Sequence, residues 1–167
     1  RFVDKYDPNS RQSNQSKNQN VVVNPKETKP SPPPSKPKDV YKGDPEAAQE
    51  YLDRLTDLFY VKGKEQERIK LANIALSLDN KSANAYHHRA AAKLDLEDYA
   101  GSISDYTKAI NINNKVSSFY FGRGNAKRLS EDYIGSISDF TNAIKLNSNK
   151  FGYYLYRGVA KFQLEDY

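Results

Sequence analysis

Residues 83–116 read ANAYHHRAAAKLDLEDYAGSISDYTKAINI followed by NNKV, and residues 117–150 repeat the pattern as SSFYFGRGNAKRLSEDYIGSISDFTNAIKL followed by NSNK. The two copies are identical at 16 of 34 aligned positions. Residues 151–167 begin a third copy, which matches the second at 8 of its 17 positions. A fixed period of this length is typical of a stacked repeat array. The fold and the function therefore have to be inferred from the repeat.

Each copy contains two amphipathic segments separated by a short polar turn. The spacing of apolar residues predicts first helices over 86–96 and 120–130, and second helices over 99–112 and 133–146. Asp98 and Asp132 stand where an aspartate caps the start of a helix. Because the turns are only two or three residues long, the helices of a pair should be antiparallel neighbours.

Further helices are predicted on both sides of the regular copies. Upstream, Asp44 precedes a helix over 45–62 that Gly63 ends, and a second helix ends near residue 80. In the 34-residue frame, residues 49–82 form a degenerate first copy, with Arg68 where the later copies have serine. Downstream, the partial repeat 151–167 holds one helix over 153–164.

The run RGNAK at 123–127, followed by EDYIGSISDF at 131–140, resembles the tetratricopeptide repeat in a variant familiar from bacterial members. The resemblance implies an all-α, right-handed solenoid of antiparallel helix pairs. It also reveals departures from the family: Asn114 and Ser148 replace the proline that usually closes the second helix. The last unit stops at Tyr167 without its second helix. We expect repeats to continue beyond it, or this end to associate with another copy.

Residues 1–44 predict a disordered basic tail, which leaves residues 45–167 as the repeat domain. The tail holds seven of the eight prolines and nine basic against five acidic side chains, whereas the remainder carries seventeen against sixteen. Its few apolar residues cannot offset the entropy of ordering it. The Pro-rich run 29–38 is either a spacer or a ligand for an aromatic groove. The repeats themselves give no specific nucleic-acid signal.

No constellation of residues predicts catalysis, a metal site or a cofactor. The chain lacks cysteine and any apolar run that would span a membrane. His87 and His88 are adjacent, so they project about 100° apart on a helix and are poorly placed to chelate one ion. Gly122-Arg123-Gly124 resembles part of a phosphate loop, but the repeat explains both glycines as packing positions. We expect a protein that is not an enzyme.

Arginine recurs on the first helices at Arg89, Arg123 and Arg157, and aspartate recurs on the second helices at Asp105 and Asp139. The resemblance implies a leucine and an aromatic residue on each first helix, and this chain replaces them with these arginines and with Lys93, Lys127 and Lys161. A buried guanidinium needs a partner, because an unpaired buried charge is strongly destabilising. The sequence therefore predicts internal Arg–Asp pairs, with an anion-recognising stripe as the alternative.

The resemblance also implies a concave binding face, to which each first helix contributes four positions. These residues are His87, Ala91, Leu94, Asp95, Phe121, Asn125, Arg128, Leu129, Leu155, Val159, Phe162 and Gln163. Most are apolar, which favours an amphipathic helix or an extended apolar peptide as the ligand. Leftover stacking surface is the alternative interpretation.

The family's best-known clamp, in which Lys, Asn and Arg grip the carboxylate of a chaperone tail, is not expected. The matching positions hold His87, Ala91, Gly122, Gly152 and Tyr156. The sequence predicts a non-catalytic interaction module or assembly scaffold that binds another protein or a peptide. The alternative is an accessory segment of a larger enzyme or of a secretion or envelope component. The sequence does not determine the compartment, and the two options are the cytoplasm and, if an upstream signal or anchor has been removed, the periplasm.

Overall fold

The structure, a computed structural model, describes residues 43–165, so all but the last two residues of the predicted tail lie outside the described residues. Within this range the chain forms seven α-helices and no strand. The helices are α1 Pro45–Asp57, α2 Glu65–Leu78, α3 Ala83–Asp95, α4 Tyr99–Ile112, α5 Ser117–Leu129, α6 Tyr133–Leu146 and α7 Phe151–Glu165.

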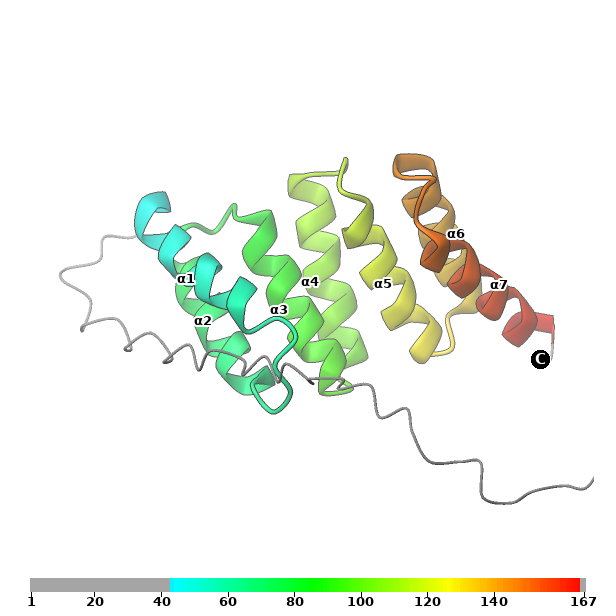
Figure 1. Cartoon of the computed structure of the whole chain (residues 1–167), viewed down its shortest axis with the longest axis horizontal. Coiled ribbons are helices and arrows are strands. Elements are labelled where there is room, and N and C mark those ends of the chain that lie inside the picture. Colours follow the sequence, from blue (N-terminus) through cyan, green and yellow to red (C-terminus); the bar gives the residue numbers. More distant parts are fainter. Residues whose placement is uncertain (1–42, 166–167) are drawn as a thin grey trace, which may run out of the picture. The chain divides into compact units, whose positions relative to one another are not determined.

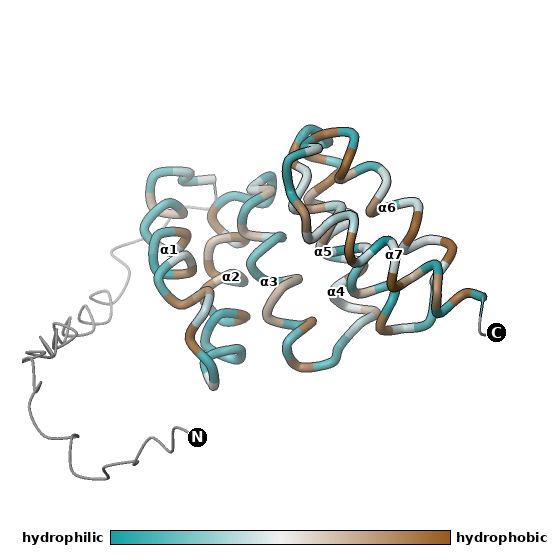
Figure 2. Tube along the Cα trace, turned by 45° about the vertical axis from the view of Figure 1, so that its right-hand side comes forward, coloured by the Kyte–Doolittle hydropathy of each residue, from teal (hydrophilic) through white to brown (hydrophobic). Residues whose placement is uncertain are grey.

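The helices are stacked in sequence order, each against the one before it (Figure 1). The odd-numbered helices also contact one another along the stack, α1 with α3, α3 with α5 and α5 with α7, whereas the even-numbered helices do not. The odd-numbered helices therefore form the tighter layer. Hydrophobic and hydrophilic residues alternate along each helix (Figure 2), as expected for helices that bury one side.

The predicted boundaries are confirmed for the second helices, and the first helices begin three residues earlier than predicted. α4 and α6 span the predicted residues, and the carboxylates of Asp98 and Asp132 accept hydrogen bonds from the amides of Gly101 and Gly135, each at 2.9 Å. α3 gains its first turn because Ser82 Oγ accepts a hydrogen bond from the Ala85 amide at 3.3 Å.

The prediction that α1 continues to residue 62 is wrong. The Asp44 carboxylate caps α1 as predicted, accepting from the Ala47 amide at 3.0 Å, but the helix ends at Asp57. The chain then turns, and the Phe59 ring packs against the rings of His87 and His88 on α3, at centroid distances of 5.7 and 5.4 Å. These tertiary contacts draw Phe59 away from the path of the helix.

Between adjacent helices, within a pair and between pairs, glycine allows an aromatic ring to approach the backbone. Gly122 on α5 lies directly against the Tyr106 ring of α4, and a Cβ at Gly124 would stand 3.0 Å from the Phe140 ring of α6. Both rings are buried, at 3% and 0% exposure. Both glycines are therefore packing positions, as the repeat predicts.

We expect Gly122→Ala to lower the free energy of unfolding by about 1–3 kcal/mol, because the new methyl group collides with the Tyr106 ring. Gly158→Ala on α7 is the matched control, since no atom lies within 4 Å of the Cβ it would add. That change should stabilise the protein by about 0.5–1 kcal/mol through helix propensity. Urea denaturation of both variants measures the difference, and equal stabilities would contradict the packing described.

Candidate binding groove and the ion pairs behind it

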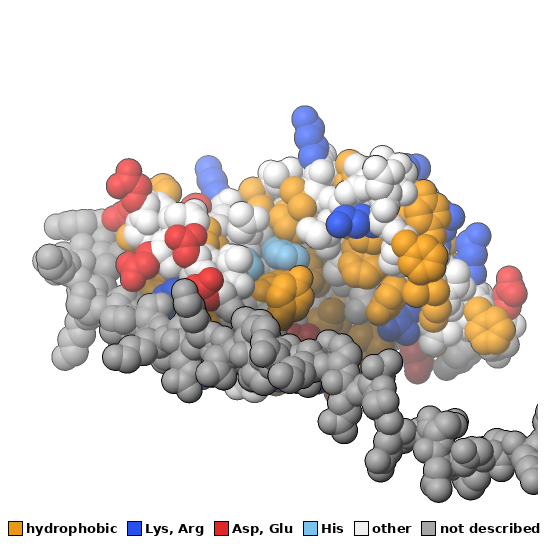
Figure 3. Space-filling view, viewed as in Figure 1, with side chains coloured by type: hydrophobic (Ala, Val, Ile, Leu, Met, Phe, Trp, Pro, Cys, Tyr) orange, Lys and Arg blue, Asp and Glu red, His pale blue; other side chains and the backbone are white. Residues whose placement is uncertain are grey.

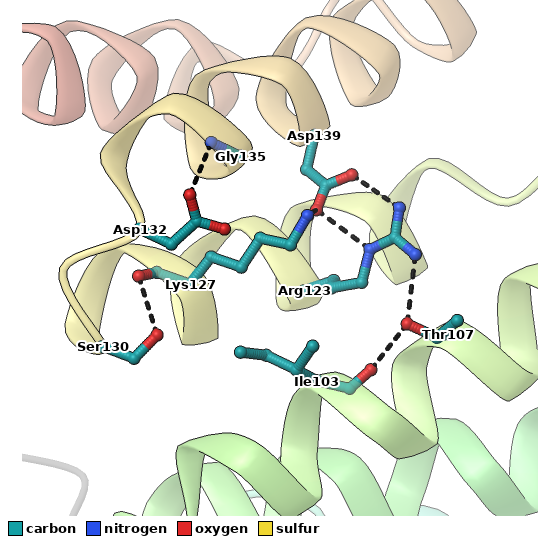
Figure 4. A network of polar contacts seen from close by, with 8 residues as sticks. All are labelled: Ile103, Thr107, Arg123, Lys127, Ser130, Asp132, Gly135 and Asp139. Carbon is teal, nitrogen blue, oxygen red and sulfur yellow. Dashed lines mark hydrogen bonds and ion pairs between the residues drawn. The ribbon is translucent and has the colours of Figure 1, made fainter.

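Each regular helix pair buries one aspartate beneath two cations of its first helix. In α5 and α6, Arg123 donates from Nε and Nη2 to the Asp139 carboxylate at 2.9 and 2.7 Å, and Lys127 Nζ lies 2.9 Å from the same group (Figure 4). Asp139 is 2% exposed. Arg123 Nη1 also donates to Thr107 Oγ1 on α4 at 3.1 Å, so this Arg–Lys–Asp triad links three helices.

The same triad recurs one repeat earlier. Arg89 donates to both oxygens of Asp105 at 2.8 and 2.7 Å, Lys93 Nζ lies 2.8 Å from Asp105, and Arg89 Nη1 donates to Asn73 on α2 at 2.7 Å. Burial alone would raise the pKa of Asp105, but hydrogen bonds from Arg89 and Lys93 outweigh it and hold this pKa below its ordinary range. The predicted Arg–Asp pairs are therefore present at these two positions, each with a lysine added.

The groove positions predicted on α3 are largely enclosed. Ala91 is 8% exposed, and His87 lies among the rings of Phe59, Tyr106 and Phe119 at centroid distances of 5.2–5.7 Å. Leu94 is half-buried. Of the four, Asp95 alone is exposed, and its carboxylate accepts a hydrogen bond from Arg68 Nη1 at 2.7 Å. These positions offer a ligand little free surface.

The groove positions predicted on α5 and α7 come together at the surface. Arg128 donates to the Asn125 carboxamide on its own helix at 3.0 Å and to Gln163 on α7 at 3.4 Å. Its guanidinium also lies over the Tyr156 ring at 5.6 Å. The same two helices carry exposed apolar side chains, with exposed fractions of 38% for Leu129, 50% for Leu155, 39% for Val159 and 65% for Phe162. Phe121 is half-buried against Phe140, Tyr153 and Tyr156.

We call this surface the α5–α7 groove, and its residues are Asn125, Arg128, Leu129, Leu155, Val159, Phe162 and Gln163. Figure 3 shows that hydrophobic side chains gather over this end of the stack and acidic ones over α1. On α1, the exposed carboxylates are those of Glu46, Glu50, Asp53 and Asp57. The odd-numbered helices thus present an acidic region at one end and an apolar, Arg-containing region at the other.

Sequence reasoning missed the burial of Arg68. Its side chain on α2 is buried at 1% exposure, beneath the Phe59 ring at 5.0 Å, and only Nη1 has a hydrogen-bond acceptor. The repeat register could have revealed this burial, because Arg68 aligns with Ser102 and Ser136, which are both fully buried.

The part of the chain described by the structure shows no group of three or more His, Asp or Glu side chains placed to hold a metal ion. Among the same residues, no helix is both long and apolar enough to cross a membrane.

Comparison with known proteins identifies this arrangement. The profile of the tetratricopeptide repeat matches residues 83–116, and the solved structures similar to this chain include domains of that kind. Residues 83–116 are thus similar to a tetratricopeptide repeat, and the described helices have the fold of such domains. The predicted fold class, an all-α solenoid of antiparallel helix pairs, is thereby confirmed. Among proteins of curated function, no match is found.

Three tetratricopeptide structures illustrate the likeness. The first such domain of Spaghetti (RPAP3), bound to an HSP90 peptide SRMEEVD, is 21% identical, with a TM-score of 0.70 over 74% of this chain and 98% of that one. The Arabidopsis OM64 domain is 24% identical, with a TM-score of 0.67 over 71% and 97%. The second domain of human RPAP3, in complex with an HSP70 peptide, is 22% identical, with a TM-score of 0.65 over 70% and 98%.

We expect Asp139→Asn to lower the free energy of unfolding by about 3 kcal/mol, because it leaves Arg123 and Lys127 without their carboxylate in a buried site. Asp57→Asn, at an exposed position of α1, removes the same charge and should change stability by less than about 0.5 kcal/mol. Urea denaturation at neutral pH compares the two. A small effect of Asp139→Asn would show that the triad contributes little.

The histidines predict a loss of stability in mild acid. Burial, with nearby positive charge, lowers the pKa of His87 and of His88 to about 4, from an ordinary value near 6.5. Between these two pKa values the unfolded chain binds more protons than the folded chain. The free energy of unfolding should therefore have its full value above this pH window and decrease as the pH falls through it. From pH 7 to pH 5 we expect a loss of about 1–2 kcal/mol per histidine.

Chemical denaturation at several pH values measures this effect, and His87→Gln should reduce the slope of stability against pH. A slope that is unchanged in this variant would contradict the assignment of His87 as a buried neutral group.

Proposed function

We propose that this chain is a non-catalytic interaction module that binds a peptide or a segment of a partner protein in the α5–α7 groove. The observation that carries the proposal is the pairing of exposed apolar side chains with a fixed cation. Asn125 and Gln163 hold the guanidinium of Arg128, and the exposed Val159 lies one turn before Gln163 on α7, with the exposed Phe162 next to it in sequence. Apolar contacts would supply affinity and the cation would select an acceptor group.

The ligand that fits this groove carries an aromatic or aliphatic side chain beside a carbonyl or carboxylate. Arg128 Nε is buried without a hydrogen-bond partner among the described residues. The hydrogen bond from Nη1 to Gln163 is long, at 3.4 Å. A ligand oxygen that displaces Gln163 would make a charge-assisted hydrogen bond with the arginine. The neighbouring rings would cover that bond and exclude water from it.

Acidic chaperone tails are poor candidates for this ligand, although two of the similar structures are described with HSP90 or HSP70 peptides. At the positions of the family's clamp, Ala91 and Gly122 are buried and His87 is enclosed by rings. The exposed carboxylates of α1 would also repel an acidic peptide that ran along the odd-numbered helices. The ligand we propose is therefore apolar at its centre and confined to the α5–α7 end.

We further propose that residues 45–167 act as one repeat domain, with residues 49–82 as its degenerate first copy. α1 and α2 pack on α3 through a shared core of Ala48, Tyr51, Leu55, Leu71, Ala72, Ala75, Leu76, Leu78 and Ala85. An accessory role within a larger enzyme or envelope component remains the alternative. It would use the same groove, so the test below applies to both.

Peptides selected from a random phage-displayed library on the 167-residue chain should depend on the groove. We expect Phe162→Ala and Arg128→Gln each to weaken binding of the selected peptides at least about tenfold, since each removes a central contact. Tyr60→Ala is the control, because Tyr60 is a 91% exposed aromatic residue on the α1–α2 loop. Isothermal titration calorimetry measures the affinities, and circular dichroism checks that the variants remain folded.

Equal affinities of the selected peptides for all three variants would contradict the proposal that the α5–α7 groove is the binding site. The synthetic peptide SRMEEVD serves as a second probe, and we expect no saturable binding of it at millimolar concentration. Micromolar binding of this peptide would place the chain with the chaperone-tail binders instead.

A further inference from the structure

The side chain of Arg68 on α2 is buried with most of its hydrogen-bonding groups unused. Nη1 donates to the Asp95 carboxylate at 2.7 Å, whereas Nε and Nη2 are buried and have no partner among the described residues. The side chain of Asp95 is 50% exposed, so the single ion pair of Arg68 lies at the surface. Buried donors without acceptors destabilise a fold. Arg68 is therefore arranged unlike a residue whose role is to hold the stack together.

The repeat does not account for this arginine. Arg89 and Arg123 occupy another position of the repeat, and each uses Nε, Nη1 and Nη2 for hydrogen bonds to neighbouring helices. In the first helix pair, the positions of that arginine and of its aspartate hold Leu55 and Leu71, which are both buried. Apolar packing replaces the ion pair there, so Arg68 adds a charge that the stack does not require.

A cavity of about 430 Å³ lies beside Arg68, where the loop between α1 and α2 meets the end of α3. This volume is in the range of small-molecule sites. The other residues of its wall are three apolar side chains, one cation and two carboxylates: Phe59, Tyr60, Val61, Lys62, Glu65 and Asp95. None of them belongs to the α5–α7 groove, so the two sites are separate.

The loop of residues 58–64 forms one wall of this cavity. The ring centroid of Phe59 lies 5.0 Å from Arg68 Cζ, so the ring covers the guanidinium. The next three loop residues, Tyr60, Val61 and Lys62, are exposed. Exposed segments with few buried contacts are the parts of a protein that shift at the lowest cost in free energy. A displacement of the Phe59 ring would therefore open Nε and Nη2 of Arg68 to the cavity.

We propose that this cavity, called here the Arg68 cavity, binds a small zwitterion, namely an α-amino acid with an aromatic or aliphatic side chain. The ligand carboxylate pairs with Arg68 and Lys62. Its ammonium group pairs with Glu65. Its side chain packs on the ring of Phe59, which shifts to admit the carboxylate to Nε and Nη2.

Charge balance selects a zwitterion over a simple anion. The wall of the cavity holds two positive and two negative side chains, so it is neutral overall. A ligand with only a carboxylate would face Glu65 and Asp95 without compensation. A zwitterion instead offers a carboxylate to the guanidinium and an ammonium group to the acidic side chains, and both contacts are charge-assisted hydrogen bonds.

Isothermal titration calorimetry of the 167-residue chain with L-phenylalanine tests the proposal. We expect saturable one-to-one binding with a Kd of about 1 mM or lower, as is usual for a ligand of this size. L-phenylalaninamide lacks the carboxylate and should bind at least about tenfold more weakly. N-acetyl-L-phenylalanine lacks the ammonium group and should bind about fivefold more weakly, because Glu65 is partly exposed.

Two variants separate binding from folding. Arg68→Met should weaken binding of L-phenylalanine at least about tenfold, while the urea midpoint stays equal or rises, because an apolar side chain replaces a charge with unpaired donors. Glu65→Gln should weaken L-phenylalanine about fivefold and leave the affinity for N-acetyl-L-phenylalanine unchanged. Lys70→Gln is the matched control, since it removes an exposed positive charge from the same helix outside the cavity. It should bind L-phenylalanine as the unmodified protein does.

Absence of saturable binding of L-phenylalanine would overturn the proposal, as would equal affinities of Arg68→Met and Lys70→Gln. Equal affinities for L-phenylalanine and its N-acetyl form would contradict the zwitterion, because they would indicate a site for any carboxylate. A lower urea midpoint of Arg68→Met together with unchanged binding in Glu65→Gln would assign Arg68 to the fold alone and would likewise overturn the proposal.

Discussion

The buried carboxylate of each regular helix pair constrains most of this structure. Asp105 and Asp139 lie inside the stack, so each must be ionised beside cations or be protonated. Two cations from the preceding helix, four residues apart on one face, meet each carboxylate. The arginine then continues to a polar side chain on the helix before it, Asn73 or Thr107. This chain of contacts sets the register of three successive helices.

An ion pair of this kind does not need to add much net stability to matter. Desolvation of the charges offsets much of their attraction, but leaving one partner alone is costly. The triads therefore act mainly against misaligned stacking, since any slip of one helix against the next would leave a buried charge unpaired. Glycines at 122 and 124 depend on the same register, because they allow Tyr106 and Phe140 to approach the α5 backbone.

The first helix pair departs from the Arg–Lys–Asp pattern of the later pairs, and this departure affects which residues are exposed on the odd-numbered helices. Arg68 replaces the small buried serine of the later pairs and reaches Asp95 at the end of α3. Phe59 covers Arg68 and joins the rings that enclose His87, a position that elsewhere would line a groove. Open apolar surface is thus concentrated at the α5–α7 end, while α1 presents carboxylates.

The 34-residue period was sufficient to predict the features that recur with it. These are the helices α4 and α6, their caps Asp98 and Asp132, and the Arg–Asp pairs. It was insufficient wherever contacts distant in sequence decide the outcome. Helix propensity continues past residue 57, but packing of Phe59 on α3 ends α1. His87 has the spacing of a groove residue, yet its exposure depends on Phe59 in the loop after α1. Asn125, Arg128 and Gln163 were each predicted as groove residues. Their hydrogen bonds could not be predicted, because the distance between α5 and α7 was not known from the sequence.

The central claim is that ionised, cation-held carboxylates lie inside the stack, and the titration of Asp105 tests it most directly. Carbon-13 NMR of the aspartate side-chain carboxyls, followed as the pH is lowered, reports the pKa of each carboxyl. The account predicts that Asp105 titrates below the range of the exposed aspartates, because hydrogen bonds from Arg89 and Lys93 outweigh its burial. A pKa for Asp105 at or above that of the exposed aspartates would contradict the account.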